Sequence, residues 1–491
     1  MMGENAVSSN GDTTAAEALR RDIRVNTNAT EAKLDQAALR ELEESFRGQL
    51  VRRENPTYDE HRRVWNGSID RFPALIARCA GVADVIAVVR FARKAGLPVA
   101  IRGGGHSFPG LSVCDGGIVI DLGPMKGIRV DPEARTARAQ AGVLWGELDR
   151  ETQAFGLATT GGIVTHTGVA GLTLGGGIGW LQRKHGLTID QLLGMDLVTA
   201  EGDLVKASES ENPDLFWGLR GGGGNFGIVT EFEFRLHPVG PIVFAGPIFW
   251  PLEKAPDLLR FYREWSAEAP DELMTIVVQR KAPPLSFVPA ELHGKPVVSV
   301  ACCYAGPVDE GEKVVRPLKA FASPVLDLCE PKPYVVHQAM FDASFPHDWW
   351  YYMRACDVAE LSDEVIDIAV EHALQIRSPL TAFPIWQLGG AVARVAEEET
   401  AFNGRGAGHT FNITGMTATV EGFDAEREWV RTFWSALEPH HTSVYVNFLM
   451  DEGQGRVREA YGSEKYDRLQ ALKRQYDPDN FFRLNQNIPP N

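Results

Sequence analysis

The sequence predicts an α+β fold in at least two parts, and three observations support this prediction. The chain has 491 residues, of which 44% are hydrophobic and 23% are charged, so it is long enough to bury more than one core. Three dense glycine clusters lie within residues 103–227, separated by short strand-like runs. After Pro238 the clusters stop, and aromatic strand-like runs alternate with amphipathic helical segments. The sequence therefore predicts a glycine-rich part followed by a separate α+β domain built on an antiparallel sheet.

The glycine-rich part is expected to be rich in strands, with helices inserted between them. Apolar residues at helical spacing predict helices over 34–47 and 82–95, and Gly96 is expected to end the second. Short runs bounded by turn residues predict strands over 71–79, 98–102, 117–122, 127–130 and 136–141. A hairpin over 195–207 and an alternating strand over 228–236 follow. Beyond residue 240, amphipathic helices are predicted over 253–267, 363–375 and 424–438.

Composition and charge limit the partners and the compartment. The chain has 49 Lys and Arg against 65 Asp and Glu, a net charge of −16, which repels nucleic acids and anionic membranes. No run of 18 apolar residues predicts a transmembrane helix, and residues 1–40 have the character of a flexible polar extension without the apolar core of a signal peptide. The six cysteines are scattered, which favours reduced thiols. We therefore expect a cytoplasmic protein with neither nucleic acid nor membrane as a partner.

The glycine clusters point to a nucleotide. A glycine-rich turn lets backbone N–H groups approach a pyrophosphate closely, because no Cβ atom stands in the way. A single cluster is more often an ordinary tight turn, but three within residues 103–227 of an acidic chain favour a dinucleotide held by backbone amides. The spacing Gly-x-Gly-x-x-Gly between a strand and a helix is missing, so a nicotinamide site fits poorly. The histidines show no His-x-x-x-His pair, and no metal site is predicted.

Longer motifs around these clusters show a family resemblance. The runs are IRGGGHS at 101–107, GVAGLTLGGGIG at 168–179, FWGLRGGGGNFGIVT at 216–230, YVNF at 445–448 and YDPDNFFRLNQNI at 476–488. They resemble the FAD-linked oxidases of the vanillyl-alcohol oxidase superfamily, and most closely its berberine-bridge-enzyme-like branch. The resemblance covers residues 45–491. It implies a two-subdomain FAD-binding domain of the vanillyl-alcohol oxidase type over 41–240, a substrate-binding domain over 241–440, and a segment over 441–491 that returns to the FAD domain.

The resemblance also implies how FAD is held. In the family, the histidine that matches His106 is bonded to the 8α-methyl group of the flavin. Some members add a second link through a cysteine, but Val164 holds that position here, so we expect a single link. By motif match, the expected FAD-binding positions are Arg102, Gly103, Gly104, Gly105, His106, Ser107, Gly110, Thr165, Gly168, Gly171, Thr173, Gly175, Gly179, Asn225, Gly227, Ile228, Val229, Asn485 and Asn487.

The catalytic base is left open. In many relatives the motif Tyr-x-Asn-Tyr ends in a tyrosine that removes the substrate proton, but this chain has Phe448 there, which has no hydroxyl. Tyr445 begins the motif and is a candidate, although packing is its more expected role. Gln387 and Arg394, placed by the resemblance on one pocket strand, and Tyr352 on an aromatic strand are the other principal candidates.

Further candidates are Asn412 on the next pocket strand, His166 beside the expected flavin, and Tyr351 and Arg354 on the aromatic strand of Tyr352. Without the tyrosine base, we expect a substrate that is already acidic, such as a phenol or a β-dicarbonyl compound.

The predicted reaction is an oxidation of a small organic molecule. In an oxidase, hydride would pass from a phenolic, polyketide-like, alcohol or amine substrate to the flavin, and O₂ would accept the electrons. One alternative is a dehydrogenase that uses another electron acceptor. A second alternative is a flavin-binding protein without turnover. The sequence predicts no oligomeric state.

Overall fold

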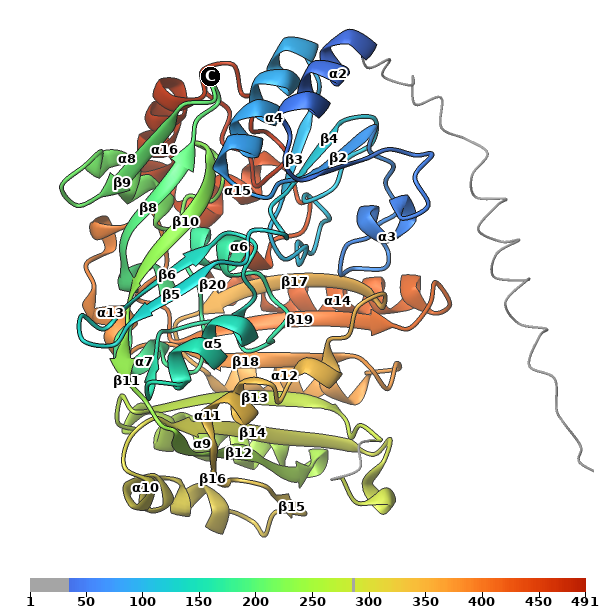
Figure 1. The fold of residues 1–491 in the computed structure, drawn as a ribbon. Helices are drawn as coiled ribbons and strands as arrows, with labels where there is room; N and C mark the ends of the chain where they lie inside the picture. Colours follow the sequence, from blue (N-terminus) through green and yellow to red (C-terminus); the bar gives the residue numbers. More distant parts are fainter. Residues whose placement is uncertain (1–34, 285–287) are drawn as a thin grey trace, which may run out of the picture.

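The computed structural model describes residues 35–284 and 288–491, so almost all of the extension predicted for residues 1–40 lies outside the described residues. Three sheets of four, five and nine strands organise this part of the chain, together with a two-stranded pair (Figure 1). The two smaller sheets form the glycine-rich domain, and the nine-stranded sheet forms the second domain. The predicted α+β class is confirmed.

The first sheet has the strand order β1-β2-β4-β3. Strands β2 (Leu75–Arg78), β4 (Ile118–Asp121) and β3 (Val99–Arg102) run parallel, and β1 (Gln49–Val51) is antiparallel to β2. Helix α4 (Val82–Ala95) connects β2 to β3, and α2 (Gln36–Ser45) packs against it. A short helix, α3 (Tyr58–Arg62), lies between β1 and β2. As predicted, α4 ends at Gly96, whose left-handed φ of 63° lets its N–H donate to carbonyls of the last turn.

The second sheet is antiparallel, with the order β5-β6-β10-β8-β9. Its strands are β5 (Ile128–Asp131), β6 (Thr136–Gln140), β8 (Leu192–Val198), β9 (Leu204–Ser208) and β10 (Ile228–Arg235). The connections contain α5 (Trp145–Gln153), α6 (Val169–Leu174), α7 (Gln182–His185) and α8 (Pro213–Leu219). Strand β7 (Leu157–Ala158) pairs with β11 (His237–Pro238), where the chain leaves this domain.

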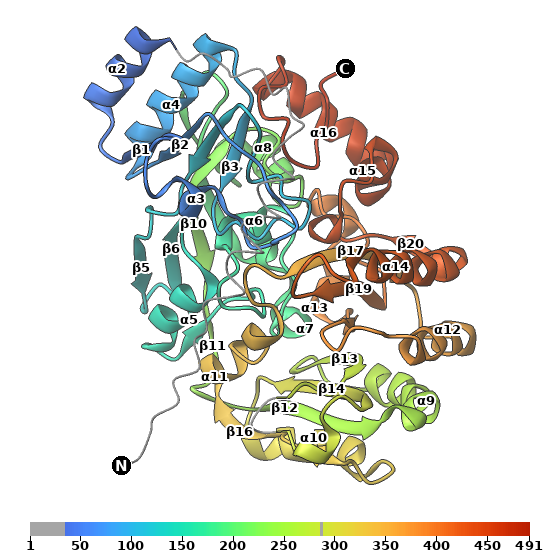
Figure 2. The same ribbon diagram turned by 90° about the vertical axis from the view of Figure 1, so that its right-hand side faces the viewer.

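The third sheet is antiparallel and spans residues 242–443. Its strands are β12 (Ile242–Pro251), β13 (Leu273–Lys281), β14 (Pro296–Tyr304), β15 (Leu326–Asp327), β16 (Glu330–Pro333), β17 (Trp350–Val358), β18 (Ala382–Gln387), β19 (His409–Thr417) and β20 (His441–Ser443). One face is covered by α9 (Ala255–Ala267), α10 (Val308–Ala320), α12 (Asp363–Leu374) and α14 (Phe423–Leu437), as Figure 2 shows. The short helix α11 (Tyr334–Gln338) contacts α5 of the other domain.

Strand alternation gives the nine-stranded sheet two apolar faces. Val277, Ile385 and Phe411 belong to the core beneath the helices. Their strand neighbours Ile276 and Trp386 belong instead to the core shared with the glycine-rich domain. The sheet is therefore buried between its own helices and the glycine-rich domain, and its second face is the one that can meet a ligand bound there.

After β20 the chain returns to the glycine-rich domain. Helices α15 (Gln454–Tyr461) and α16 (Ser463–Tyr476) pack on each other, and α16 contacts α8. The final residues run back beside the third glycine cluster through hydrogen bonds described below. No helix in the described part of the chain is both long and apolar enough to cross a membrane.

One predicted element differs from the structure. The strand expected to contain both Gln387 and Arg394 ends at Gln387. Gly389 and Gly390 follow with φ angles of 84° and 58°, which break the extended conformation. Arg394 lies instead at the end of the short helix α13 (Ala391–Arg394).

Candidate active site

A cavity of about 360 Å³ lies between the two domains. One side consists of the three glycine clusters (103–105, 171–179 and 221–227) with the C-terminal segment, and we call it the glycine wall. The opposite side consists of residues from β13, β18 and β19, and we call it the sheet wall. Its members include Ile276, Pro384, Trp386 and Asn412.

The first two clusters form the glycine wall by close backbone contact. A Cβ atom at Gly104 would lie 2.4 Å from the backbone nitrogen of Gly168, and a Cβ at Gly168 would lie 2.4 Å from that of Gly104. Both positions therefore need glycine for packing. By contrast, a Cβ at Gly171 or Gly224 would meet no atom within 4 Å, and both residues line the cavity. Their missing side chains leave open space where a ligand can reach the backbone.

The C-terminal segment fixes the third cluster. The buried Asn225 side chain donates to the carbonyl of Gly222 (2.9 Å) and accepts from the N–H of Ile488 (3.0 Å). The fully buried Lys473 ammonium group donates to the Asn225 carbonyl (2.8 Å) and pairs with Asp477 (2.6 Å). These bonds hold the two chain segments together, so the end of the sequence completes the glycine wall.

The lining of this wall fits a dinucleotide such as FAD. The side-chain oxygens Ser112 Oγ, Tyr461 Oη and Asn485 Oδ1 are buried and have no hydrogen-bond partner in the described part of the chain. All three residues line the cavity. Because buried polar atoms normally have partners, these atoms indicate a polar ligand. The open backbone at Gly171 and Gly224 provides the accompanying space.

The structure brings most of the predicted FAD-binding positions together. Those that line the cavity are Gly103, Gly104, Gly105, His106, Ser107, Gly168, Gly171, Gly175, Asn225, Gly227, Ile228, Val229 and Asn485. Those that do not line it are Arg102, Gly110, Thr165, Thr173, Gly179 and Asn487.

Several of the positions outside the cavity support its lining. Arg102 forms a buried ion pair with Asp121 (2.9 Å) directly before the first cluster. Thr173 donates to the Val169 carbonyl (2.7 Å) within α6. A Cβ at Gly179 would lie 1.8 Å from the Gly161 carbonyl oxygen, so glycine is needed there for packing.

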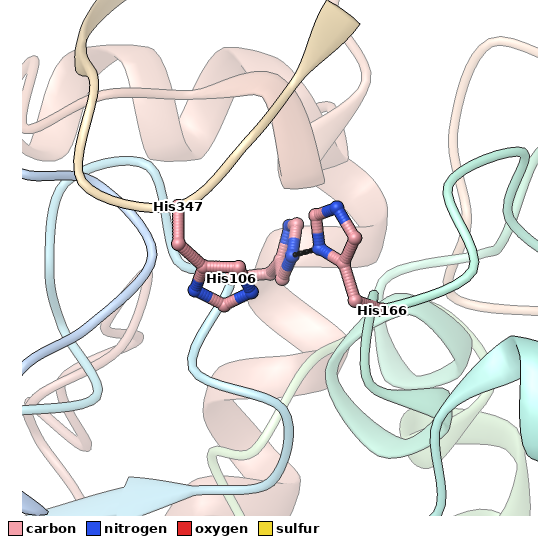
Figure 3. Close-up of side chains that lie close together, drawn as sticks. All are labelled: His106, His166 and His347. Carbon is pink, nitrogen blue, oxygen red and sulfur yellow. Dashed lines mark hydrogen bonds between the residues drawn. The ribbon is translucent and has the colours of Figure 1, made fainter. Parts of the chain in front are cut away.

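His106 lies at the edge of the cavity in a group of three histidines (Figure 3). Its Nε2 is 2.6 Å from Nδ1 of His166, and its ring stacks on Trp65 with centroids 4.7 Å apart. His347 approaches from the residues before β17, and ligand atoms of the three histidines lie within 4.8 Å of one another. Two nitrogens bound to one zinc ion would be roughly 3.4 Å apart at usual bond lengths. The 2.6 Å contact instead fits a shared proton.

Burial keeps His106 and His166 neutral. It lowers the pKa of His106 well below its usual value, and the neighbouring His166 and His347 lower it further. Burial also lowers the pKa of His166, with a second contribution from His347, while Asp342 acts in the opposite direction. At neutral pH His106 therefore has one unprotonated nitrogen, which is the form that can act as a nucleophile.

Tyr445 lines the cavity, but its hydroxyl is bonded to the protein. It accepts from the backbone N–H of Gly177 (2.9 Å) and from the Asn447 side chain (2.7 Å), which also donates to the Leu172 carbonyl. Burial raises the pKa of Tyr445 to about 12. The hydroxyl therefore stays protonated near neutral pH, and its contacts support the second glycine cluster.

The sheet wall and its surroundings are aromatic. Trp386 lies near Phe448, with ring centroids 6.2 Å apart, and Phe448 in turn contacts Tyr445. Further aromatic lining comes from Trp65, Phe108, Phe341 and Phe345. Within residues 35–284 and 288–491, no Asp, Glu, Lys or Arg side chain lines this cavity.

Asn412 is the polar residue of the sheet wall. It is 6% exposed, and its Oδ1 accepts a hydrogen bond from the Thr414 hydroxyl. This bond orients the amide so that its NH₂ group is available to a molecule in the cavity. Asn412 was one of the candidates that the sequence suggested on a pocket strand.

The other principal catalytic candidates lie away from the cavity. Gln387 accepts from Thr275 (2.7 Å) and donates to the Ser266 carbonyl (2.9 Å), so it faces α9 while its neighbour Trp386 faces the cavity. Arg394 is mostly exposed and pairs with Asp271 (2.6 Å) on the surface. Their predicted placement in the pocket is therefore corrected.

Tyr352, a further catalytic candidate, also lies away from the cavity. Its hydroxyl accepts from Arg431 (3.2 Å) on α14, on the helix side of the sheet. The adjacent Tyr351 lies on the opposite face and stacks on Trp65 with centroids 3.8 Å apart. The alternation of strand β17 thus directs the second tyrosine of the pair away from the cavity.

Several residues near the cavity were not found from the sequence, among them Trp65, Phe345 and His347. They lie in connecting segments outside every recognised motif, and no local pattern marks them. Only the packing of β17 and its preceding loop against the first sheet brings them beside His106.

Comparisons with known proteins agree with this geometry. Residues 73–208 match the family model described as an FAD binding domain, and residues 444–489 match the model described as berberine and berberine like. An uncharacterized FAD-linked oxidoreductase of Bacillus subtilis is 33% identical over 454 residues, covering 90% of this chain and 97% of the relative.

A relative of known activity is similar over the same length. (R)-6-hydroxynicotine oxidase of Paenarthrobacter nicotinovorans is 30% identical over 466 residues, covering 91% of this chain and 97% of the relative. The crystal structure of 6-hydroxy-D-nicotine oxidase from Arthrobacter nicotinovorans superposes with a TM-score of 0.82 at 30% identity, covering 91% of this chain and 99% of that one.

Proposed function

Because the chain belongs to the berberine-bridge-enzyme-like family of FAD-linked oxidoreductases and so oxidises an organic substrate with FAD, we propose a more specific reaction. The protein is an oxidase that has FAD bonded to His106 alone and uses O₂ as its electron acceptor. Its substrate is a flat, uncharged small molecule with an acidic hydroxyl, such as a phenol or an enol.

The absence of charge around the cavity is the observation that supports this substrate class. No Asp, Glu, Lys or Arg lines the cavity in the part of the chain that the structure describes. A charged substrate group would lose its water there without gaining an ionic partner, which is unfavourable. The rings of Trp386 and Phe448 offer apolar surface to a flat molecule. A hydroxylated sugar would leave many polar groups without partners.

The proton chemistry supports an acidic substrate. Phe448 has no hydroxyl, and Tyr445 stays protonated because its pKa is raised to about 12. A substrate that ionises readily needs no protein base of this kind. The Asn412 NH₂ group can then donate to the phenolate or enolate oxygen and stabilise its charge. Bound FAD supplies the two-electron acceptor for the hydride that leaves the substrate.

The single covalent link is supported by two positions. His106 lines the cavity beside the glycine wall, and burial keeps it neutral. Val164, at the position of the second link in some relatives, also lines the cavity and cannot form a thioether. Gel electrophoresis of the acid-denatured protein should leave flavin fluorescence on the protein band, and His106→Ala should remove it. Free flavin released from the unaltered protein would contradict the link.

An oxygen-uptake screen tests the reaction. The purified protein is given neutral phenols and β-dicarbonyl compounds, matched cationic amines, and neutral sugars, with peroxide measured in parallel. We expect uptake with the first group. The kcat should rise with pH around the pKa of each bound substrate, because kcat reports ionisation in the enzyme–substrate complex. A sugar or a cationic amine as the best substrate would contradict the proposal. Flavin bleaching without oxygen uptake would indicate the dehydrogenase alternative, and no bleaching by any compound would indicate a binding protein.

We also propose a cytoplasmic location, supported by the state of the thiols. All six cysteines are free and buried, although Cys302 in β14 and Cys329 between β15 and β16 lie close together. Such thiols persist in a reducing compartment. Cell fractionation tests this location, and recovery of the protein from the culture medium would contradict it.

A further inference from the structure

We propose that His166 accepts the proton that His106 loses when His106 Nδ1 forms its covalent bond to the flavin. His166 therefore promotes cofactor attachment through His106 and does not itself bond to the flavin. This inference rests on the proposed link at His106, and it adds a residue and a ring nitrogen that the family motif does not specify.

The geometry distinguishes the two nitrogens of His106. Its Nε2 is occupied by His166 Nδ1 at 2.6 Å (Figure 3). Its Nδ1 has only a long contact of 3.5 Å with Thr167 Oγ1. Stacking on Trp65 at an interplanar angle of 18° holds the ring in this orientation. Nδ1 is therefore the nitrogen left free to form a bond.

The hydrogen bond also determines which tautomer of His106 reacts. A nucleophilic Nδ1 must be unprotonated, so the proton of the neutral ring is on Nε2. Nε2–H then donates to His166 Nδ1, which requires His166 to be neutral with its own proton on Nε2. Burial lowers the pKa of both histidines, which favours this pair of neutral rings.

The attachment step balances with these groups. The flavin 8α-methyl group would first lose one proton to water, and the electron pair of that C–H bond would move into the flavin ring, which leaves an electrophilic exocyclic methylene carbon. The Nδ1 lone pair of His106 forms the N–C bond, and two electrons pass into the flavin ring, which becomes reduced. His106 is then a cation, and its Nε2 proton passes to His166. O₂ would take the two electrons from the reduced flavin together with two protons, equal to the one released to water and the one passed to His166, which gives hydrogen peroxide and restores the oxidised cofactor.

The surroundings of His166 suit a residue that accepts and releases a proton. The Asp342 carboxylate accepts from the N–H of the adjacent Thr165 (2.8 Å) and from its hydroxyl, which fixes the loop. The same carboxylate raises the pKa of His166 against the lowering effects of burial and of His347. Protonated His166 therefore has a nearby anion to stabilise it.

A second cavity offers the proton a route away from the flavin. It has a volume of about 330 Å³, lies between α5 and α11, and is lined by His166, Thr165, Glu147, Asp149 and Gln338. His166 thus contacts His106 on one side and this polar cavity on the other. Burial raises the pKa of Asp149 to about 7, so this carboxyl group can exchange protons near neutral pH. The cavity is also large enough to admit a molecule of imidazole.

Attachment kinetics in the full-length protein test the proposal. Flavin-free protein is incubated with FAD in air, and the covalent fraction is measured over time by fluorescence of the acid-denatured band. Non-covalent FAD binding is measured separately by release of flavin on denaturation. His166→Ala should bind FAD yet attach it about 100-fold more slowly, the scale of a lost general base. Added imidazole should restore much of the rate.

Two further variants separate proton transfer from packing. His166→Asn can still accept a hydrogen bond from His106 but cannot take its proton, so it should be as slow as His166→Ala. His347→Ala removes the third histidine, which has no hydrogen bond to His106, and should attach FAD at the original rate or faster. His106→Ala should show no attachment with or without imidazole.

The outcomes distinguish this inference from the proposed function. No covalent flavin in the unaltered protein would contradict the link at His106 itself. Covalent flavin in the unaltered protein, with attachment equally fast in His166→Asn, would leave the link intact and overturn the role of His166. A slow His166→Ala that imidazole does not rescue, combined with a fast His166→Asn, would show a packing role only and would equally overturn it.

Discussion

The glycine wall and the sheet wall of the cavity are built on different principles. The glycine wall presents backbone, and its shape depends on close contacts such as that between Gly104 and Gly168. The sheet wall presents side chains, such as Trp386 and Asn412, from strands whose backbone is already paired in the sheet. Substitutions should therefore affect folding and FAD binding at the first wall, and substrate recognition at the second.

The largest effect is expected at Gly168. Gly168→Ala places a Cβ 2.4 Å from the backbone nitrogen of Gly104, so the two clusters must separate. We expect a loss of about 3 kcal/mol in the free energy of unfolding, with or without FAD. Gly171→Ala is the matched control. Gly171 lies in α6, and a Cβ atom added there would meet no atom within 4 Å. This variant should leave the flavin-free protein as stable as before and weaken FAD binding. Thermal unfolding of both forms measures this, and equal stability of the two variants would contradict it.

At the sheet wall, Asn412→Ala should affect the reaction and not the fold. Removing the NH₂ group takes away the donor for the substrate oxygen, and kcat/KM should fall about 30-fold, equivalent to about 2 kcal/mol. Arg394→Ala is the control, since this exposed residue lies outside the cavity and should leave the kinetics unchanged. Steady-state oxygen uptake gives both values. A large effect of Arg394→Ala with none at Asn412 would reverse our assignment.

Tyr445 lines the cavity, but its hydroxyl contacts predict a structural role in the glycine wall and no role in the reaction. Tyr445→Phe removes the hydroxyl bonded to Gly177 and Asn447, and should lower the free energy of unfolding by about 1–2 kcal/mol. The pH dependence of kcat/KM should keep its shape, because a hydroxyl with a pKa of about 12 does not ionise in the working range. Denaturant unfolding and a pH series measure the two effects. Disappearance of a basic limb in the variant would identify Tyr445 as the base.

The smallest effect is expected at Phe448, which lies where the two walls meet. Phe448→Leu keeps an apolar group but loses the ring beside Trp386. We expect KM to rise about fivefold, near 1 kcal/mol, with kcat changed by less than about twofold. Kinetics with the best substrate of the screen provide the measurement. A large fall in kcat at constant KM would show that the ring acts in the chemical step.

The same contrast explains what could be predicted from the sequence. The glycine wall is encoded in contiguous motifs, because a backbone that needs glycine needs it at fixed spacing, as at 103–105. Helix α4 and its end at Gly96 were likewise predictable from periodicity and a terminal glycine. The glycine clusters predicted a dinucleotide, and the family resemblance implied that it is FAD.

The sheet wall could not be predicted in the same way. Every residue of β18 is buried, so the strand shows no apolar–polar alternation that would tell which residues face the cavity. Gln387 and Trp386 could be assigned to their faces only once the helices of one side were placed. His347 and Trp65 contact His106 from segments about 280 residues apart in the sequence. No local sequence pattern predicts a contact between segments so far apart.

The burial of the nine-stranded sheet on both faces has a consequence for how this enzyme can diversify. Along β13, β18 and β19, the residues that touch a substrate alternate with residues such as Val277, Ile385 and Phe411 that pack beneath the helices. Exchanges at Ile276, Pro384, Trp386 and Asn412 therefore leave the helix-packed layer unchanged. A library randomised at these four positions could explore new substrates while each member inherits the same scaffold and the same cofactor chemistry.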